Sequence, residues 1–389
     1  MTAPRSAGRA GDRSTRPELP PVQPMDRTAR IERLRAALGH WAPGGVEALV
    51  VHKPANIRWL TGFTGSNGLL LITDDAVVAV TDGRYQDQIE AELAGAGVEA
   101  TVEITITDIG RVLAHHLGPR HRLGVEAHHV TWRQRDDLAE WLPGTELVPL
   151  DKPLEGLRRD KDDGERSRLA RAAAIADAAL AQVLPRLGSR PTERQMARAL
   201  ENAMFDLGAD ALSFDTIVAA GPNSALPHAR PSDRVIEPDD LVVIDFGAAV
   251  DGYGSDMTRT FVAGGEPTAE QQRLWDAVRE AQAAGVAAVS DGAAERSIDE
   301  ACRSVLVGHG LGDAFTHSTG HAIGLEIHED PILSARAVGI LRAGYVVTVE
   351  PGVYVPGVGG VRIEDSVIVG NGGCQPITHS PKRLAPLPA

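Results

Sequence analysis

Acidic residues stand inside apolar, strand-like runs at four places in the sequence. They are Asp245 in VVIDF, Asp256 in GSDMT, Glu350 in VTVEP and Glu364 in VRIED. An ionised carboxylate in a low-dielectric environment costs free energy unless a cation or hydrogen-bond donors compensate for its charge. One such acid would be unremarkable, but four in two predicted hairpins indicate a shared cationic partner. That partner is either bound metal or a set of arginines such as Arg259 and Arg362, because ion-pair networks also place charges in clefts.

Three histidines, His317, His321 and His328, stand close together in THSTGHAIGLEIHED, residues 316–330. The first two have the spacing of a helical zinc motif, but two glycines weaken a helix there and no Glu follows His317. Adding His321 to the four acids gives a ligand set of four carboxylates and one imidazole. Four negative charges balance two divalent cations, as expected of a two-metal hydrolytic centre.

Two predicted β-hairpins must position these acids. The first joins LVVIDFGAAV to SDMTRTFVAG through the turn DGYG, and the second joins YVVTVEPGVYV to GGVRIEDSVIV through PGVG. We expect Asp245 to face Asp256 across the first hairpin and Glu350 to face Glu364 across the second. Helical stretches such as EQQRLWDAVREAQAAGVAAV separate these strands, so the pattern predicts antiparallel sheet covered by helices.

The chain divides into three predicted parts. Residues 1–25 mix Arg, Ser, Gly and Pro without an apolar core, so we expect a disordered, solvated tail, with Met25 as an alternative start. Residues 26–155 alternate strand-like and helical stretches, which predicts a smaller α/β domain. A charged linker near residues 151–162 runs into a long Ala- and Leu-rich helix, and residues 156–389 form the second domain.

Composition excludes several classes of protein. The formal charge of −14 opposes nucleic-acid binding, which depends on Lys and Arg neutralising phosphates. No apolar run approaches the roughly 20 residues that cross a bilayer, and the N-terminus lacks the apolar region of a secretory signal. The two cysteines, Cys302 and Cys374, form no paired motif and indicate no oxidising compartment. We therefore expect a cytoplasmic protein that contacts neither membranes nor nucleic acid.

Several motifs together resemble a known family. DFGAAVDGYGSDMTRT, HSTGHAIGLEIHE, TVEPGVYVPGVGGVRIED and SALPHARPSD are similar to the pita-bread metallopeptidases, specifically aminopeptidase P and prolidase. The resemblance covers about residues 160–382, and NIRWLTGFTGSNGLLLITDDAVVAVTDGRY extends it to the creatinase-like N-terminal domain of that family. It implies an α+β fold, with a pita-bread catalytic domain after a smaller α/β domain.

The resemblance also implies roles for individual residues. The metal ligands would be Asp245, Asp256, His321, Glu350 and Glu364. Asp256 and Glu364 would contact both ions, with a hydroxide bridging them, and Glu350 would relay the proton. The residues on the substrate side would be His228, His317, His328, Tyr354 and Arg362. Either His228 or His317 would stabilise the oxyanion. Arg336 could supply a cation for a substrate carboxylate, although an ordinary solvated arginine is the simpler interpretation.

The implied activity is hydrolysis of the bond between an N-terminal residue and proline. Oxygen-rich ligation with one histidine suits Mn²⁺, with Co²⁺ or Zn²⁺ as alternatives. We favour an Xaa-Pro aminopeptidase acting on peptides with proline at the second position. The alternatives are a prolidase restricted to Xaa-Pro dipeptides and a non-catalytic binding protein on the same fold, although no ligand is missing. A homodimer or higher homo-oligomer is expected from the resemblance.

Overall fold

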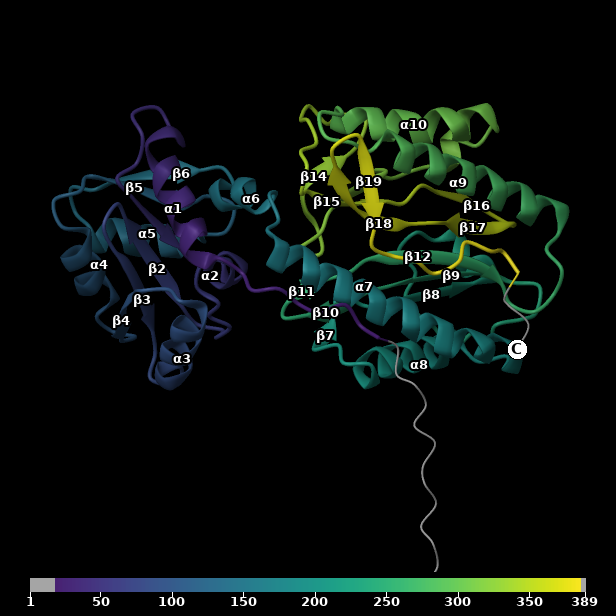
Figure 1. The fold of residues 1–389 in the computed structure, drawn as a ribbon, viewed down its shortest axis with the longest axis horizontal. Helices are drawn as coiled ribbons and strands as arrows, with labels where there is room; N and C mark the ends of the chain where they lie inside the picture. The colour runs from purple at the N-terminus through teal and green to yellow at the C-terminus, as the bar shows by residue number, and fades with distance from the viewer. Residues whose placement is uncertain (1–17, 386–389) are drawn as a thin grey trace, which may run out of the picture.

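The computed structural model describes residues 18–385 and contains two parts joined by helices α6 (Pro153–Arg158) and α7 (Asp163–Val183) (Figure 1). Asp162 caps α7 by accepting a hydrogen bond from the Glu165 backbone, and the Glu165 side chain accepts one in return from the Asp162 backbone. This capping box fixes the start of the long helix directly after the linker. No helix within the described range is both long and apolar enough to cross a membrane.

The first part is built on a six-stranded sheet in the order β4-β3-β2-β1-β5-β6. Its strands are β1 (Ala48–Val51), β2 (Leu69–Thr73), β3 (Val77–Thr81), β4 (Thr101–Ile104), β5 (Arg122–Glu126) and β6 (Glu146–Leu150). Its helices are α1 (Arg27–Ala37), α2 (Pro54–Thr61), α3 (Gln86–Ala96), α4 (Ile109–Leu117) and α5 (Trp132–Trp141). The central strands β2 and β3 are buried along their whole length, because two hydrophobic clusters cover the two faces of the sheet. The predicted α/β layers are confirmed.

The prediction of a disordered tail over residues 1–25 is wrong for residues 18–25. The Gln23 backbone N–H donates to the Ser167 hydroxyl, at 2.8 Å, and Arg171 donates to the Pro20 carbonyl, at 3.0 Å. Leu19 also packs against the hydrophobic core under α7. Residues 18–25 therefore lie along α7, because its polar side chains satisfy their backbone groups. The remainder of the expected tail, residues 1–17, lies outside the described residues.

The second part has strands between two pairs of helices. Its strands are β7 (Ala211–Leu212), β8 (Ile217–Ala220), β9 (Leu241–Phe246), β10 (Ala248–Val250), β11 (Tyr253–Gly254), β12 (Met257–Val262), β13 (Gly320–Ala322), β14 (Glu329–Leu333), β15 (Val346–Val349), β16 (Gly352–Val355), β17 (Gly359–Arg362), β18 (Asp365–Gly370) and β19 (Gly373–Pro376). Its further helices are α8 (Glu193–Asp206), α9 (Ala269–Ala288) and α10 (Glu295–Gly308). In Figure 1, α7 and α8 lie on one side of the strands and α9 and α10 on the other. The predicted antiparallel sheet covered by helices is confirmed.

Both predicted hairpins are present, but the first is kinked. Strand β9 pairs with β12 so that Thr258, not Asp256, stands opposite Asp245. The pairing is interrupted at Gly247, where an added Cβ would lie 1.9 Å from the Ser255 carbonyl oxygen. This close backbone approach requires glycine and sets Asp256 diagonal to Asp245, so the expectation that the two acids face each other directly was wrong.

The second hairpin is split into two ladders. Val349 of β15 pairs with Asp365 of β18, and β16 pairs with β17 farther along. Glu350 and Glu364 each stand one residue beyond the Val349–Asp365 pair, in the gap between the two ladders. The side chains of both acids line one cavity, as predicted for the second hairpin.

Candidate metal centre and active site

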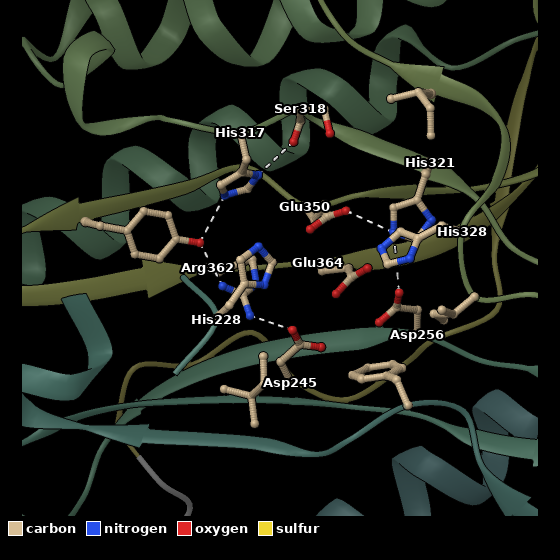
Figure 2. Close-up of a pocket in the computed structure, with 15 residues that line it drawn as sticks. His228, Asp245, Asp256, His317, Ser318, His321, His328, Glu350, Arg362 and Glu364 are labelled. Atoms are coloured by element: carbon tan, nitrogen blue, oxygen red, sulfur yellow. Dashed lines mark hydrogen bonds and ion pairs between the residues drawn. The ribbon is translucent and has the colours of Figure 1, made fainter. Parts of the chain in front are cut away.

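A cavity of about 270 Å³ opens between the two hairpins and the segment that contains the three histidines (Figure 2). Its lining residues are Phe214, Ile217, His228, Asp245, Asp256, His317, Ser318, His321, Ile327, His328, Ile332, Glu350, Tyr354, Arg362 and Glu364. The lining includes every site residue named from the sequence except Arg336. That residue is exposed in the turn after β14, and the structure does not bring it to the cavity.

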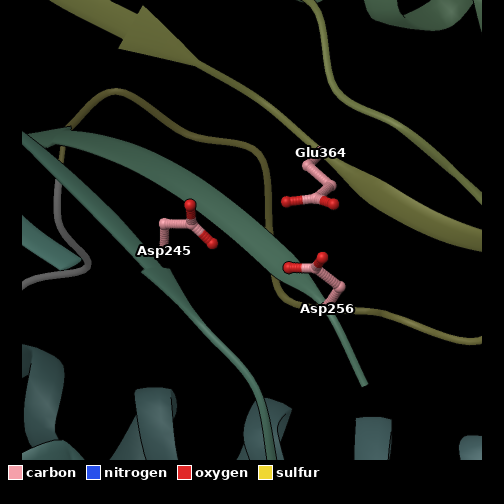
Figure 3. Close-up of side chains that lie close together, drawn as sticks. All are labelled: Asp245, Asp256 and Glu364. Carbon is pink, nitrogen blue, oxygen red and sulfur yellow. The ribbon is translucent and has the colours of Figure 1, made fainter. Parts of the chain in front are cut away.

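Three carboxylates form the floor of this cavity. Asp245, Asp256 and Glu364 each offer an oxygen within 4.8 Å of the others, and they approach from β9, from the start of β12 and from the end of β17 (Figure 3). Asp256 and Glu364 are almost completely buried. Like charges this close repel one another, so the cluster requires either protons or a cation.

His321 and Glu350 stand beside the carboxylate cluster. The Nε2 atom of His321 lies 3.3 Å from Glu350 Oε1 and 3.6 Å from Asp256 Oδ2. The Nδ1 atom lies 3.1 Å from the Ala322 carbonyl oxygen, which can only accept, so Nδ1 carries a proton. Burial would lower the pKa of His321, but the hydrogen bond and charge of Glu350 outweigh it and raise that pKa, which favours a proton on Nε2 towards the acids. A cation that replaced this proton would meet the Nε2 lone pair, while the Nδ1–H bond fixes the ring.

The pKa values of these groups follow from burial and mutual charge. Burial raises the pKa of Asp256 and Glu364 well above the ordinary carboxyl value, and neighbouring acids add to the shift. Burial likewise raises the pKa of Asp245, although Arg362 opposes it. Burial would also raise the pKa of Glu350, but the hydrogen bond and charge of His321 outweigh it and lower that pKa. Asp256 and Glu364 therefore bind protons more readily than ordinary carboxyls, and a cation that binds there must displace those protons.

The residues present fit a divalent cation. Oxygen Oδ1 of Asp245 and Oε1 of Glu364 are buried and have no hydrogen-bond partner among the described residues. A buried carboxylate oxygen without a donor is costly, and a hard cation satisfies it. The ion-pair interpretation holds only for Asp245, which contacts Arg362 at 2.5 Å, because Arg259 instead binds Asp365 at 2.8 Å. The cluster is thus a candidate metal centre.

A directed chain of hydrogen bonds borders the cavity opposite His321. Arg362 donates from Nη2 to Asp245 and from Nη1 to the Tyr354 hydroxyl, the latter at 2.7 Å. The Tyr354 hydroxyl lies 3.0 Å from His317 Nε2. His317 donates from Nδ1 to the Ser318 carbonyl oxygen, at 2.8 Å, and burial lowers its pKa, so the neutral ring accepts the Tyr354 proton at Nε2. The guanidinium of Arg362 is therefore committed to Asp245 and Tyr354.

The remaining two histidines border the cavity on different sides. His228 is exposed, in the loop before β9. His328 precedes β14, and the centre of its ring lies 4.4 Å from that of His321. Burial lowers the pKa of His328, and the charge of His321 acts in the same direction. The lowered pKa values of His317 and His328 favour neutral rings, which can donate or accept single protons beside the acids.

The sequence reasoning missed two hydroxyls that hold the acids. Thr258 donates to Glu364 Oε2, at 2.8 Å, and Thr348 donates to Glu350 Oε1, at 3.3 Å. Both threonines stand two positions from an acid of the cavity, and this period-2 spacing could have identified them, because alternate residues of a strand share a face. The apolar lining residues, such as Phe214 and Ile332, carry no such signal.

Comparisons with known proteins agree with this architecture. Residues 167–371 match the metallopeptidase family M24, and residues 30–159 match the creatinase/prolidase N-terminal domain. The chain is 40% identical to the uncharacterized peptidase YqhT of Bacillus subtilis, over 91% of this chain and 99% of that protein. It is 33% identical to an Xaa-Pro dipeptidase of Pyrococcus furiosus, over 91% and 99% of the two chains. Its fold matches the solved Xaa-Pro dipeptidase from Bacillus anthracis with a TM-score of 0.87, at 39% identity over 93% of this chain and 100% of that one.

Proposed function

Because the chain belongs to metallopeptidase family M24, we propose that it hydrolyses the peptide bond between an N-terminal residue and a following proline. The observation that carries the proposal is the buried cluster of Asp245, Asp256 and Glu364 beside His321 and Glu350. Relatives named Xaa-Pro dipeptidase support the choice of proline. The first domain resembles that of creatinase and prolidase and the second has the pita-bread fold.

Five side chains would hold two divalent cations. They are Asp245, Asp256, His321, Glu350 and Glu364. When bound, such a pair lowers the pKa of a shared water and polarises a carbonyl. One imidazole among four carboxylates favours Mn²⁺ over an ion that prefers thiolates.

The other residues of the cavity would bind substrate and move protons. Glu350, whose pKa is lowered, is the carboxylate best able to accept a proton and pass it to the leaving nitrogen. His228 is the better candidate to donate a hydrogen bond to the oxyanion, because the Nε2 atom of His317 already faces the Tyr354 hydroxyl. His317, His328 and Tyr354 would hold the peptide. A bond to proline has no N–H, so a site that grips the amine, the carbonyl and the ring suits it.

Two observations favour different substrate lengths. Arg362 is committed and Arg336 lies outside the cavity, so this chain offers no free cation in the described lining for the carboxylate of a dipeptide. That geometry favours Xaa-Pro-Yaa peptides and an aminopeptidase. The second candidate is a prolidase acting on Xaa-Pro dipeptides, and it is favoured by the names of relatives that match nearly the whole chain.

The proposal is tested by the products of matched peptides. Metal-loaded protein is expected to release the first residue from Xaa-Pro-Yaa and to leave Xaa-Ala-Yaa intact. Exhaustive chelation should abolish cleavage, and Mn²⁺ or Co²⁺ should restore it. Ser318 is the one serine, threonine or cysteine in the described lining, and no hydrogen bond joins its hydroxyl to a histidine that could activate it as a nucleophile. Full activity in metal-stripped protein would contradict the proposal. A kcat/KM for the dipeptide well above that for the tripeptide would select the prolidase.

The variants His317→Ala and His328→Ala are expected to fold, to retain metal and to lose activity by about 10²-fold each, the effect typical of one proton-transfer or oxyanion contact. Steady-state kinetics and elemental analysis of the purified variants measure the two properties. Loss of metal in either variant would show that the imidazole ligand is not His321.

A further inference from the structure

Residues 323–328 form the loop that joins β13 to β14. His321 pairs with Ile332 and Ala322 pairs with Glu329, so the register shifts and Asp330 and Pro331 form a bulge in β14 directly after this loop. His328 is the last residue of this loop, and its ring lines the cavity beside His321. Because the ladder does not define residues 323–328, contacts outside the sheet must fix the place of His328.

Two acids close to His328, one in the loop and one at the start of β14, provide such contacts. Glu326 Oε2 lies 2.7 Å from Lys53 Nζ and 2.9 Å from Arg158 Nη1. Glu329 is buried and pairs with Arg158 and, at 3.0 Å, with Lys161. The acids therefore hold the segment on both sides of His328. Arg158 and Lys161 belong to the linker, but Lys53 belongs to the first domain.

Lys53 is itself fixed to the sheet of the first domain. Its backbone N–H donates to Glu126 Oε2 at the end of β5, at 3.0 Å, and its ammonium group binds Glu155, at 2.8 Å. Asn56, one turn later in α2, donates to the other oxygen of Glu126, at 2.6 Å. The ammonium group of Lys53 thus sits between two acids, and 20% of its side chain is exposed. Lys53 is therefore anchored to the first domain, and its ammonium group faces the loop of residues 323–328.

We propose that Lys53 is a positioning residue for catalysis, which holds His328 over the cavity through Glu326. The first domain thereby forms part of the catalytic unit. This inference rests on the proposed function, since it assumes that His328 contacts the substrate. Displacement of a catalytic contact by about 1 Å can cost 10²-fold in rate, so one ion pair at a distance can control turnover.

The chain contains a matched control. Arg58, also in α2, pairs with Asp251 of the second part at 3.0 Å, and 28% of its side chain is exposed. This ion pair likewise crosses between the two parts, but it ends at the turn of the first hairpin, and within the described residues no ion pair joins Arg58 or Asp251 to residues 323–330. Comparing Lys53→Met with Arg58→Met therefore separates positioning of His328 from general docking of the two parts.

The experiment measures kcat and KM of the metal-loaded full chain with an Xaa-Pro-Yaa peptide. Lys53→Met is expected to lower kcat by about 10- to 100-fold with a smaller change in KM, whereas Arg58→Met should stay within about threefold of the wild type. Lys53→Arg should restore most of kcat, because it keeps the cation. Glu326→Gln should lower kcat at least as much, because it weakens the contacts of Glu326 with both Lys53 and Arg158. Adding Lys53→Met to Glu326→Gln should then cost little more, because the carboxylate that Lys53 holds is already absent.

A second readout does not depend on activity. Hydrogen–deuterium exchange of a peptide covering residues 323–330 is expected to accelerate in Lys53→Met and in Glu326→Gln but not in Arg58→Met. Equal losses of kcat in Lys53→Met and Arg58→Met, or wild-type kcat in Lys53→Met, would overturn the proposal. If the wild type cleaves no Xaa-Pro bond, the proposed function fails, and unchanged exchange in Lys53→Met then overturns the positioning role separately. If Lys53→Met does not fold, Lys53→Gln, which removes the charge but keeps a polar group, decides both readouts.

Discussion

The variants Asp256→Asn and Glu364→Gln are each expected to lose bound metal and to lower kcat/KM by at least about 10³-fold, since the several kcal/mol that metal ions contribute to a hydrolytic transition state correspond to that factor. Both acids are almost fully buried at the floor of the cavity, and an amide oxygen carries no charge to hold a cation there. Because burial raises the pKa of both carboxyls, metal binding to the wild type should also release protons.

Asp251→Asn is the matched control for these variants. Asp251 stands in the turn of the same hairpin as Asp256, outside the cavity, and its φ of 49° suits asparagine. This variant should retain metal content and activity, as measured by elemental analysis and peptide hydrolysis. Two metal ions per chain in Asp256→Asn or Glu364→Gln would count against the assignment of these acids as ligands.

Glu329→Gln is expected to lower the free energy of unfolding by about 3–5 kcal/mol, the usual result of removing one partner from a buried ion pair. The carboxylate of Glu329 is buried between the cations of Arg158 and Lys161, which join the linker to β14. Glutamine leaves the buried ammonium group of Lys161 without its carboxylate and leaves Arg158 with Glu326 alone. Urea unfolding of the metal-free proteins measures the difference without a contribution from metal binding.

This stabilisation should depend on pH in a defined direction. Burial would raise the pKa of Glu329, but the charges of Lys161 and Arg158 outweigh it and lower the pKa from 4.5 to about 2. A carboxyl whose pKa is lowered on folding stabilises the native state fully above its unfolded value and loses that contribution as the pH falls. The difference between wild type and Glu329→Gln should therefore be complete above about pH 5 and shrink progressively towards pH 2, over a shift worth about 3 kcal/mol.

Glu270→Gln provides the comparison for an exposed pair. Glu270 binds Arg273 one turn away on α9, and nearly half of each side chain is exposed. Its removal should change the free energy of unfolding far less than Glu329→Gln does, because water screens an exposed ion pair. A cost for Glu329→Gln as small as this would mean that the buried network adds no net stability at the junction.

The local elements of this fold could be predicted because each depends on neighbouring residues. The two hairpins follow from alternating apolar residues around glycine-rich turns, and the long helix follows from its capping acid and its Ala- and Leu-rich pattern. Acids within such strands had to share a partner, since burial of isolated charges is too costly. The same argument predicted a common cavity for acids that lie more than one hundred residues apart in the chain.

Tertiary contacts decided the exact positions of the site residues, because these contacts join residues whose spacing along the chain follows no recognisable pattern. The close approach of Gly247 to Ser255 sets Asp256 diagonal to Asp245, which the hairpin alone did not predict. Arg336 is exposed in the turn after β14, so its distance from Glu350 along the sequence did not predict whether it reaches the cavity.

The amino-acid sequence by itself determined the strands, the helices and the set of acids and histidines that must share a charge-neutralising site, because periodicity and the cost of buried charge are local properties. Only the tertiary structure decided which cation each acid receives. Arg362 is bound to Asp245, Arg259 to Asp365, and Lys53 of the first domain to Glu326 beside His328. Each of these pairs joins residues from different elements, so the packing of those elements in space decides the pairing, and the spacing along the chain does not.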